Sequence, residues 1–316
     1  MSPVPSSLNE PLPQHLAASP ARWWLATRPA FLSVTLMGAL LGIAACQPAE
    51  WLQGWPKAVL GLLLVLLAHA AVNVINDVAD DVSGCDAANS ERCFPFTGGS
   101  RFIQNGVLSR EEMRRLGYGL MAVVVAGGLW LVTLAGPWLL AIGFAGVMLG
   151  WAYSVAPCKL NSRGWGELTV ALCFWLVPLG MQTLLAGRPS SALLWAAWPY
   201  GWLTCALLYI NQFPDRNADR LAGKHHWVAR LAPQTARYGY VLWLVLAYGS
   251  VLLAVALQAL PVTCLLALLT LPLSLRALSV LWRHAAQPAQ LVPGIVATIV
   301  AANLNPLLMA AGLLIG

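Results

Sequence analysis

The chain has 316 residues, of which 59% are hydrophobic and 9% are charged, and its formal net charge is +6. Soluble domains devote roughly a quarter of their residues to charge, so 18 basic and 12 acidic side chains are too few to cover a soluble surface of this size. The composition therefore excludes a soluble enzyme, a disordered chain and a nucleic-acid-binding module. Its long apolar runs lack the short alternation of an outer-membrane barrel, which leaves an all-α polytopic membrane protein.

The chain divides into a short tail and one long apolar domain. Residues 1–21 contain five prolines and no Lys or Arg, which is typical of a disordered tail rather than a signal peptide. A membrane span needs about 20 apolar residues, and residues 22–316 contain nine such segments, predicting a single nine-helix domain. The predicted spans are 27–47, 57–80, 115–135, 137–156, 166–187, 191–213, 238–258, 260–282 and 291–315.

The basic residues indicate how these spans are oriented. With the N-terminus in the cytoplasm, 16 of the 18 Lys and Arg fall on the cytoplasmic side, and only Lys57 and Arg188 fall on the other. This asymmetry follows the positive-inside rule and predicts a multi-pass protein of the cell inner membrane. Two long polar loops, 82–113 and 214–236, lie on the cytoplasmic side, where we expect the functional site.

The aspartates gather at the predicted cytoplasmic ends of the second and sixth spans. Asn73, Asp77 and Asp81 are spaced four residues apart, which places them on one helix face, and Asn76 and Asp80 form a neighbouring row. In the second cluster Asp215 and Asp219 are again four apart, directly after Pro214, where we expect an irregular helix.

Two carboxylate pairs at one membrane face indicate a shared ligand. Oxygen ligands suit Mg²⁺, which binds a few carboxylates together with phosphate oxygens, so a cavity opening to the cytoplasmic face would hold magnesium and a diphosphate. Further positive charge for the diphosphate would come from Arg92, Arg101, Lys159 or Lys224. The alternative is that the acids form solvated ion pairs with Arg216, Arg220 and Arg92, and that each base only reflects topology.

The two aspartate clusters resemble the motifs of the UbiA superfamily of intramembrane prenyltransferases. The sequence is similar to this superfamily, and most similar to its 1,4-dihydroxy-2-naphthoate (menaquinone-type) branch, over about residues 23–315. Further similar segments are Trp24 to Pro29, Phe96-Thr-Gly-Gly-Ser-Arg101, Gly106 to Ser109, Tyr153 to Lys159, Arg163 to Leu168 and Gly223-Lys224.

The resemblance implies the transfer of an isoprenyl chain from a polyprenyl diphosphate to an aromatic acceptor within the membrane. It implies Mg²⁺ as cofactor, held by Asn73, Asp77, Asp81, Asp215 and Asp219, with Arg92 and Lys159 neutralising the diphosphate. Lys224 and Arg28 are further candidates at the mouth. Tyr153 would stabilise an allylic cation through its ring, and its alternative role is an interfacial tyrosine.

The acceptor stays open because the sequence departs from the branches at named positions. His225 and His226 stand where the naphthoate-type pattern has other residues, and we expect both to face solvent rather than bind metal. Arg92 to Pro95 only partly matches the 4-hydroxybenzoate branch. The acceptors considered are therefore 1,4-dihydroxy-2-naphthoate first, then 4-hydroxybenzoate, homogentisate, haem or a chlorin.

Two functions of other classes compete with this prediction. An ion-coupled transporter also places acids in the membrane, but the acids here cluster at one face and no inverted repeat is visible. A CDP-alcohol phosphotransferase would need an Asp-Gly-x-x-Ala-Arg segment, which is absent. No motif indicates an oligomeric state or a prenyl chain length.

Overall fold

The computed structural model describes residues 10–316, and this part of the chain contains helices and connecting segments without a β-strand. The predicted all-α fold is confirmed. The α-helices are α1 Pro13–Leu16, α2 Ala21–Leu25, α3 Leu32–Ala44, α4 Pro48–Ser83, α5 Cys85–Ala88, α6 Arg110–Ala135, α7 Pro137–Ser154, α8 Gly166–Ala186, α9 Ser191–Leu221, α10 Trp227–Arg230, α11 Pro233–Ala256, α12 Leu271–His284 and α13 Val292–Ile315. The 3₁₀ segments are η1 Pro29–Phe31, η2 Leu160–Ser162, η3 Val262–Thr270 and η4 Pro288–Gln290.

Among the described residues, eight helices are long and apolar enough to cross a membrane. They are α4, α6, α7, α8, α9, α11, the combined η3–α12 segment and α13. The remaining predicted span, 27–47, corresponds to the apolar but shorter helix Pro29–Ala44. The protein is therefore a multi-pass membrane protein.

Local sequence signals explain where several helices begin and end. The side chain of Ser109 accepts a hydrogen bond from the backbone N–H of Glu112, whose carboxylate accepts one from the backbone N–H of Ser109, so both groups cap α6. Gly84 and Gly187 end α4 and α8 with positive φ angles of 77° and 80°, which glycine adopts without strain.

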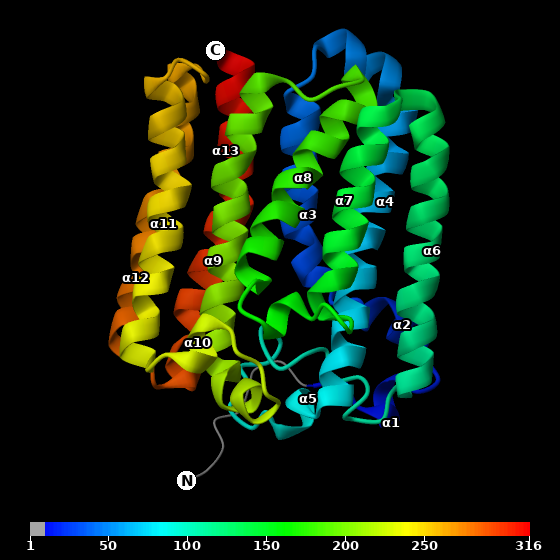
Figure 1. The fold of residues 1–316 in the computed structure, drawn as a ribbon, viewed down its shortest axis with the longest axis vertical. Coiled ribbons are helices and arrows are strands. Elements are labelled where there is room, and N and C mark those ends of the chain that lie inside the picture. The colour runs from blue at the N-terminus through cyan, green and yellow to red at the C-terminus, as the bar shows by residue number, and fades with distance from the viewer. Residues whose placement is uncertain (1–9) are drawn as a thin grey trace.

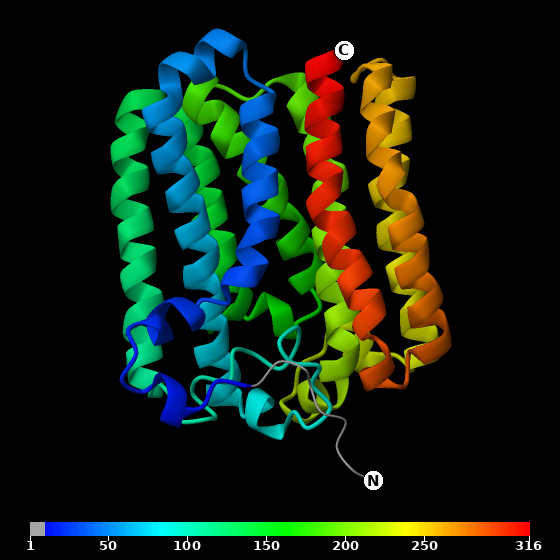
Figure 2. The same cartoon turned by 180° about the vertical axis from the view of Figure 1, so that it is seen from behind.

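The long helices stand side by side, with their connecting segments gathered at one end. Both side views place α1, α2, α5 and α10 at the lower end, whereas the C-terminus lies at the upper end (Figure 1 and Figure 2). We call the lower end, which holds segments 84–109, 155–165 and 222–232, the loop end. It is the end toward which α4 and α9 both run, as the two aspartate clusters predict.

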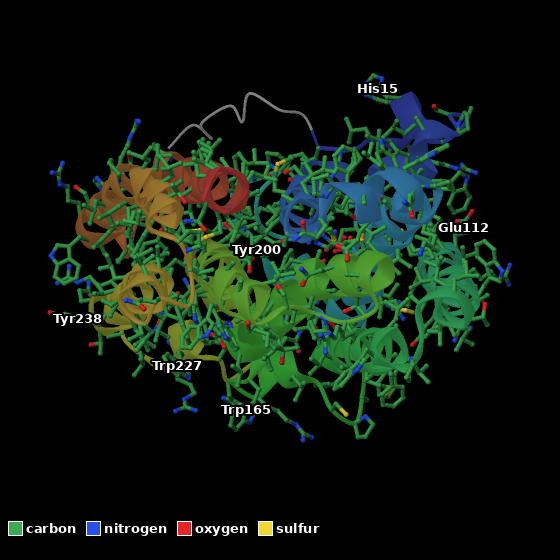
Figure 3. All side chains as sticks on the ribbon, turned by 90° about the horizontal axis from the view of Figure 1, so that it is seen from above. His15, Glu112, Trp165, Tyr200, Trp227 and Tyr238 are labelled. Carbon is green, nitrogen blue, oxygen red and sulfur yellow. The ribbon has the colours of Figure 1, made fainter. Side chains whose placement is uncertain are left out.

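Helix α9 occupies the interior of the bundle, packed against α8, α11 and α13. Its Tyr200 and Tyr209 are fully buried, and the Tyr200 hydroxyl donates to the carbonyl of Val34 in α3 over 2.9 Å. Seen along the helices, Tyr200 lies well inside the bundle, while Trp165 and Tyr238 lie toward its edge (Figure 3). The helix that carries the second aspartate pair is thus fixed from several sides.

Two segments differ from their predicted conformation. The sequence predicts that the sixth span ends near 213, but α9 continues through Pro214 to Leu221. Proline removes only one backbone donor, so the other hydrogen bonds of the last turns can still form. Asp215 and Asp219 are therefore helical. In the segment predicted as a disordered tail, residues 1–9 lie outside the described residues, whereas residues 10–21 include α1 and a contact of 2.7 Å between Glu10 and Arg92.

Candidate active site

A cavity of about 550 Å³ lies between α3, α4, α6, α7, α8 and α9 and extends to the loop end. Its walls are mostly apolar away from the loop end, and its polar groups concentrate where α4 and α9 finish. We call the residues Asp80, Asp86, Asp215, Asp219 and Lys224, all of which line the cavity, the acidic mouth. The two helices that carry the predicted aspartate clusters therefore contribute to one site.

The face of α4 that lines the cavity differs from the predicted one. Asn73, Asn76 and Asp80 line it, whereas Asp77 and Asp81 do not. A helix turns about 100° per residue, so a row of residues four apart drifts by about 40° at each step. Spacings of three and four in alternation stay on one side, and the row from Asn73 through Asn76 to Asp80 therefore faces the cavity.

Asp77 and Asp81 are occupied by other contacts. Asp77 is buried, accepts a hydrogen bond from the Ser100 backbone N–H at 3.2 Å and lies 3.9 Å from the Arg28 guanidinium. Asp81 pairs with Arg110 and accepts a hydrogen bond from the Gln104 side chain at 3.3 Å. Asp77 thus lies outside the cavity lining and contacts Arg28 and the Ser100 backbone, whereas Asp81 contacts Arg110 at the start of α6.

Lys224 joins the two acidic helices. Its Nζ lies 2.9 Å from Asp80 in α4 and 2.9 Å from Asp219 in α9. Burial alone would lower the pKa of Lys224, but Asp80 and Asp219 raise it well above its ordinary value. The lysine therefore stays charged and brings the two carboxylates to the same level of the bundle.

The expectation that both loop histidines face solvent is wrong for His226. His225 is exposed, but His226 is only 2% exposed, and its Nε2 lies 2.9 Å from Asp219 Oδ2. Its Nδ1 accepts the backbone N–H of Ala229, so the imidazole also caps α10. Because Nδ1 is an acceptor, Nε2 carries the proton toward Asp219 and fixes this carboxylate in place.

A glycine-containing loop links the two clusters from the loop end. The backbone N–H of Gly98 donates to Asp215 Oδ2 at 3.4 Å, and that of Ser100 donates to Asp77. Asn89 donates to the other oxygen of Asp215 at 2.6 Å. Gly98 and Gly99 have φ angles of 80° and 75°, and a Cβ on Gly99 would collide with the Asp86 carboxylate. The loop therefore requires glycine to reach the aspartates so closely.

Asp86 belongs to the site although no motif singled it out. It is 3% exposed and lines the cavity, and its Oδ2 has no hydrogen-bond partner in the part of the chain that the structure describes. Burial, followed by the charges of Asp80 and Asp77, raises the pKa of Asp86 to about 8. A cation bound nearby would favour the charged form of this carboxyl. Only its place nine residues after Asp77, within the polar loop, could have indicated this role.

The other predicted residues divide between the cavity and its surroundings. Tyr153 and Arg28 line the cavity. Arg92 does not, because it is held by Glu10 and by the carbonyl of Asn89. Lys159 is exposed and also lies outside the cavity lining.

The predicted alternative of ion pairs between the acids and loop arginines does not describe the cavity. Arg216 donates to the carbonyls of Val228 and Leu231, each at 2.9 Å. Within residues 10–316, neither Arg216 nor Arg220 forms an ion pair with a cluster aspartate, and Arg92 pairs with Glu10 instead. Of the mouth carboxylates, Asp215 and Asp86 therefore form no ion pair within the described residues and are available to a cationic ligand.

The donor atoms of the mouth suit a hard divalent cation. No three His, Cys, Asp or Glu side chains of the described residues converge tightly enough to hold a metal ion by themselves. Carboxylate and amide oxygens nevertheless surround the mouth, and Asp86 Oδ2 is buried there without a partner. Magnesium needs only one or two carboxylates when phosphate oxygens complete its shell, so the residues fit an ion that arrives with a diphosphate.

The comparison with known proteins assigns the chain to a family. The profile of the UbiA prenyltransferase family matches residues 31–299. The chain belongs to the UbiA prenyltransferase family. The prediction of a membrane-embedded prenyltransferase is thereby confirmed, and the chain is an enzyme rather than a transporter.

Relatives with curated names agree with this assignment. A 1,4-dihydroxy-2-naphthoate octaprenyltransferase of Mycobacterium tuberculosis is 32% identical, covering 82% of this chain and 86% of the relative. The protein of the same name from Escherichia coli is 30% identical, covering 68% and 70%. A UbiA homolog from Archaeoglobus fulgidus, solved bound to GPP and Mg²⁺, superposes with a TM-score of 0.57 at 14% identity, covering 91% of this chain and 99% of that chain.

Proposed function

We propose that this UbiA-family enzyme transfers an isoprenyl chain from a polyprenyl diphosphate to 1,4-dihydroxy-2-naphthoate or a related quinone precursor, in a reaction that depends on Mg²⁺. The observation that carries the proposal is the acidic mouth at the end of a largely apolar cavity. The names of the two naphthoate octaprenyltransferases support the acceptor, and the homolog bound to GPP and Mg²⁺ supports the donor and the metal.

The head of the donor would bind at the acidic mouth. Asp80, Asp86, Asp215 and Asp219 would hold magnesium, aided by Asn76, which lines the cavity one turn from Asp80, in place of the set predicted from the sequence. The bound ion would stabilise the charge that develops on the departing diphosphate. Arg28 and Lys224 line the same cavity and would supply further positive charge. We place Asp77 one layer behind, as the residue that fixes Arg28 and the Ser100 loop.

The tail of the donor would lie along the apolar walls of the cavity. Leu64, Leu131 and Leu184 form one packed cluster there, from α4, α6 and α8, and all three line the cavity. An isoprenoid chain gains free energy from leaving water for such a surface. The apolar walls and the charged mouth thus match the two halves of a polyprenyl diphosphate.

The chemistry needs protection of a carbocation from water. When the allylic carbon–oxygen bond breaks, its electron pair leaves with the diphosphate, and a ring carbon of the acceptor forms the new carbon–carbon bond. The ring then loses a hydrogen as H⁺ or its carboxylate as CO₂ and becomes aromatic again. The ring of Tyr153 lines the cavity and would stabilise the allylic cation through its π face. The surrounding apolar walls keep water from competing with the acceptor.

We also infer the placement of the enzyme. The concentration of Lys and Arg at the loop end supports a cytoplasmic mouth in the inner membrane, with residues 22–316 as one domain of nine membrane helices. A cytoplasmic mouth would admit Mg²⁺ and a charged donor from water, while the tail stays in the bilayer.

A direct assay tests the proposal. The full chain in detergent is supplied with geranyl diphosphate, Mg²⁺ and, in turn, 1,4-dihydroxy-2-naphthoate, 4-hydroxybenzoate and homogentisate. We expect pyrophosphate release and a prenylated product, identified by mass spectrometry, with the naphthoate, and no turnover in excess EDTA until Mg²⁺ is restored. Prenylation of another acceptor alone would refute the naphthoate assignment, and undiminished turnover in EDTA would refute the metal dependence.

A further inference from the structure

A second polar group lies in the cavity, deeper than the acidic mouth. It consists of His69 in α4 together with Asn211 and Gln212 in α9, and all three line the cavity. We call it the deep polar group. An isoprenoid tail offers these three side chains no hydrogen bond.

The depth of this group follows from the Lys224 bridge. Lys224 contacts both Asp80 and Asp219, so these two aspartates mark one level of the bundle. His69 precedes Asp80 by eleven residues, and Asn211 precedes Asp219 by eight. At 1.5 Å per residue, these positions lie about 16 Å and about 12 Å deeper. His69 therefore lies well beyond the mouth, whereas Asn211 lies four residues, or about 6 Å, beyond Asp215, the innermost mouth residue of α9.

Each side chain of the deep polar group has an atom that can accept a hydrogen bond and has no donor within the described residues. Within residues 10–316, Asn211 Oδ1 and Gln212 Oε1 are buried without a hydrogen-bond partner, and the Gln212 residue is only 8% exposed. His69 Nδ1 lies 2.7 Å from the hydroxyl of Thr35, itself 1% exposed, and within the described residues Nε2 has no hydrogen-bond partner. Unpaired buried acceptors are costly, so their presence in a cavity indicates a ligand that brings donors.

The surroundings of His69 suit a flat ring. The His69 imidazole meets Phe174 edge-on, with ring centroids 5.4 Å apart, and Phe174 meets Tyr200 in the same way at 5.8 Å. Phe174 and Phe31 also line the cavity. Aromatic rings prefer such edge and offset contacts, so the acceptors stand beside surfaces that an aromatic ligand can pack against.

We propose that His69, Asn211 and Gln212 bind the aromatic acceptor through its ring hydroxyls, and that the preferred acceptor is a 1,4-dihydroxyarene. The inference rests on the proposed function and deepens it. One hydroxyl donates to His69 Nε2, whose orientation Thr35 fixes, and the opposite hydroxyl donates to the amide oxygens of α9. The ring then lies inside the cavity, on the membrane side of the donor's diphosphate.

Binding without turnover tests the proposal. The full chain in detergent, under argon and without donor, is titrated with 1,4-dihydroxynaphthalene and with 1-naphthol, and tryptophan fluorescence reports the affinities. We expect the wild type to bind the dihydroxy compound about tenfold more tightly, because the second hydroxyl satisfies a buried acceptor. His69→Leu and, independently, Gln212→Met should reduce this preference to less than threefold.

Matched substitutions outside the cavity serve as controls. His284→Leu removes a loop-end histidine that contacts Gln287, and Asn303→Leu removes an amide bonded to the carbonyl of Ile299 in its own helix. Both should keep the tenfold preference. Affinity for geranyl diphosphate with Mg²⁺ reports folding and should stay within twofold of the wild type in every variant. Gln212→Met, on a different helix, decides the matter if His69→Leu does not fold.

The possible outcomes separate this inference from the proposed function. Retention of the tenfold preference in folded His69→Leu and Gln212→Met, or its absence in the wild type, would overturn the acceptor site. Failure of the proposed function would appear instead in the turnover assay, as a wild type that releases no pyrophosphate with any acceptor. The binding result could still be interpreted in that case.

Discussion

The mouth of the cavity and its wall between α6 and α7 are built in opposite ways. At the mouth, carboxylates are held by Lys224, His226 and Asn89 through hydrogen bonds and ion pairs of 2.6 to 2.9 Å. At the wall, Gly128 and Gly143 line the cavity, and a Cβ on either would meet nothing within 4 Å. The mouth thus holds its carboxylates in fixed positions, whereas the wall offers open apolar space and, among the described residues, no polar contact that would fix a ligand in one position.

The largest expected effect concerns the mouth carboxylates. Asp80→Ala or Asp215→Ala should lower pyrophosphate release by about 10²- to 10³-fold, because each removes electrostatic stabilisation of the leaving group. Asp81→Ala is the matched control, since Asp81 pairs with Arg110 outside the cavity, and it should change the rate less than threefold. Equal losses of rate in Asp80→Ala and Asp81→Ala would instead support the row of Asn73, Asp77 and Asp81 predicted from the sequence.

The next prediction compares two glycines of the loop, Gly99 and Gly106, to separate the cost of backbone strain from a loss of turnover at the mouth. Gly99→Ala and Gly106→Ala both place alanine at a positive φ, 75° and 72°, and each should lower stability by about 1–2 kcal/mol in thermal unfolding. Only the Cβ at Gly99 collides with Asp86, so only Gly99→Ala should also lower turnover, by about tenfold or more. Similar turnover in the two variants would contradict the tight packing of the loop.

A smaller effect is expected at the wall. Gly143→Trp should fill part of the cavity and lower kcat/KM for a long polyprenyl diphosphate about tenfold relative to geranyl diphosphate, because only the longer tail reaches the wall. Gly119→Trp is the control, since Gly119 is exposed, has similar open space and does not line the cavity. A chain-length ratio that Gly143→Trp leaves unchanged would place the tail elsewhere.

The smallest effect is expected at Lys159, which the resemblance implies as a diphosphate ligand. The side chain is exposed and outside the cavity lining, so Lys159→Gln should change the donor KM less than twofold. A rise of tenfold or more in that KM would show that the segment 155–165 moves over the mouth when the donor binds.

These expectations show which properties could be predicted from the sequence. Apolar segment length and the bias of Lys and Arg depend on local composition, and they predicted the helices and the common end of both acidic clusters. The choice between Asp80 and Asp81 could not be predicted reliably, because it depends on a rotation of α4 that its packing against α6, α3 and α8 determines. A spacing of four residues predicted Asn73, Asp77 and Asp81, whereas the Asn and Asp residues of α4 that line the cavity are Asn73, Asn76 and Asp80.

The roles of Asp86 and His226 also needed the folded chain. Each lies in a polar loop, where a sequence pattern predicts exposure, and each is buried because the loop folds back over the ends of α4 and α9. The burial of His226 follows from its contact with Asp219 and its cap on α10, two interactions that no periodicity reveals.

The central claim is that the acidic mouth binds the donor's diphosphate together with magnesium. Calorimetric titration with a non-cleavable geranyl thiodiphosphate, with and without Mg²⁺, tests it most directly. We predict binding that requires Mg²⁺, is lost in Asp80→Ala and Asp215→Ala, and persists in Asp81→Ala. Binding of equal strength in EDTA, or binding unaffected by both mouth substitutions, would contradict the claim.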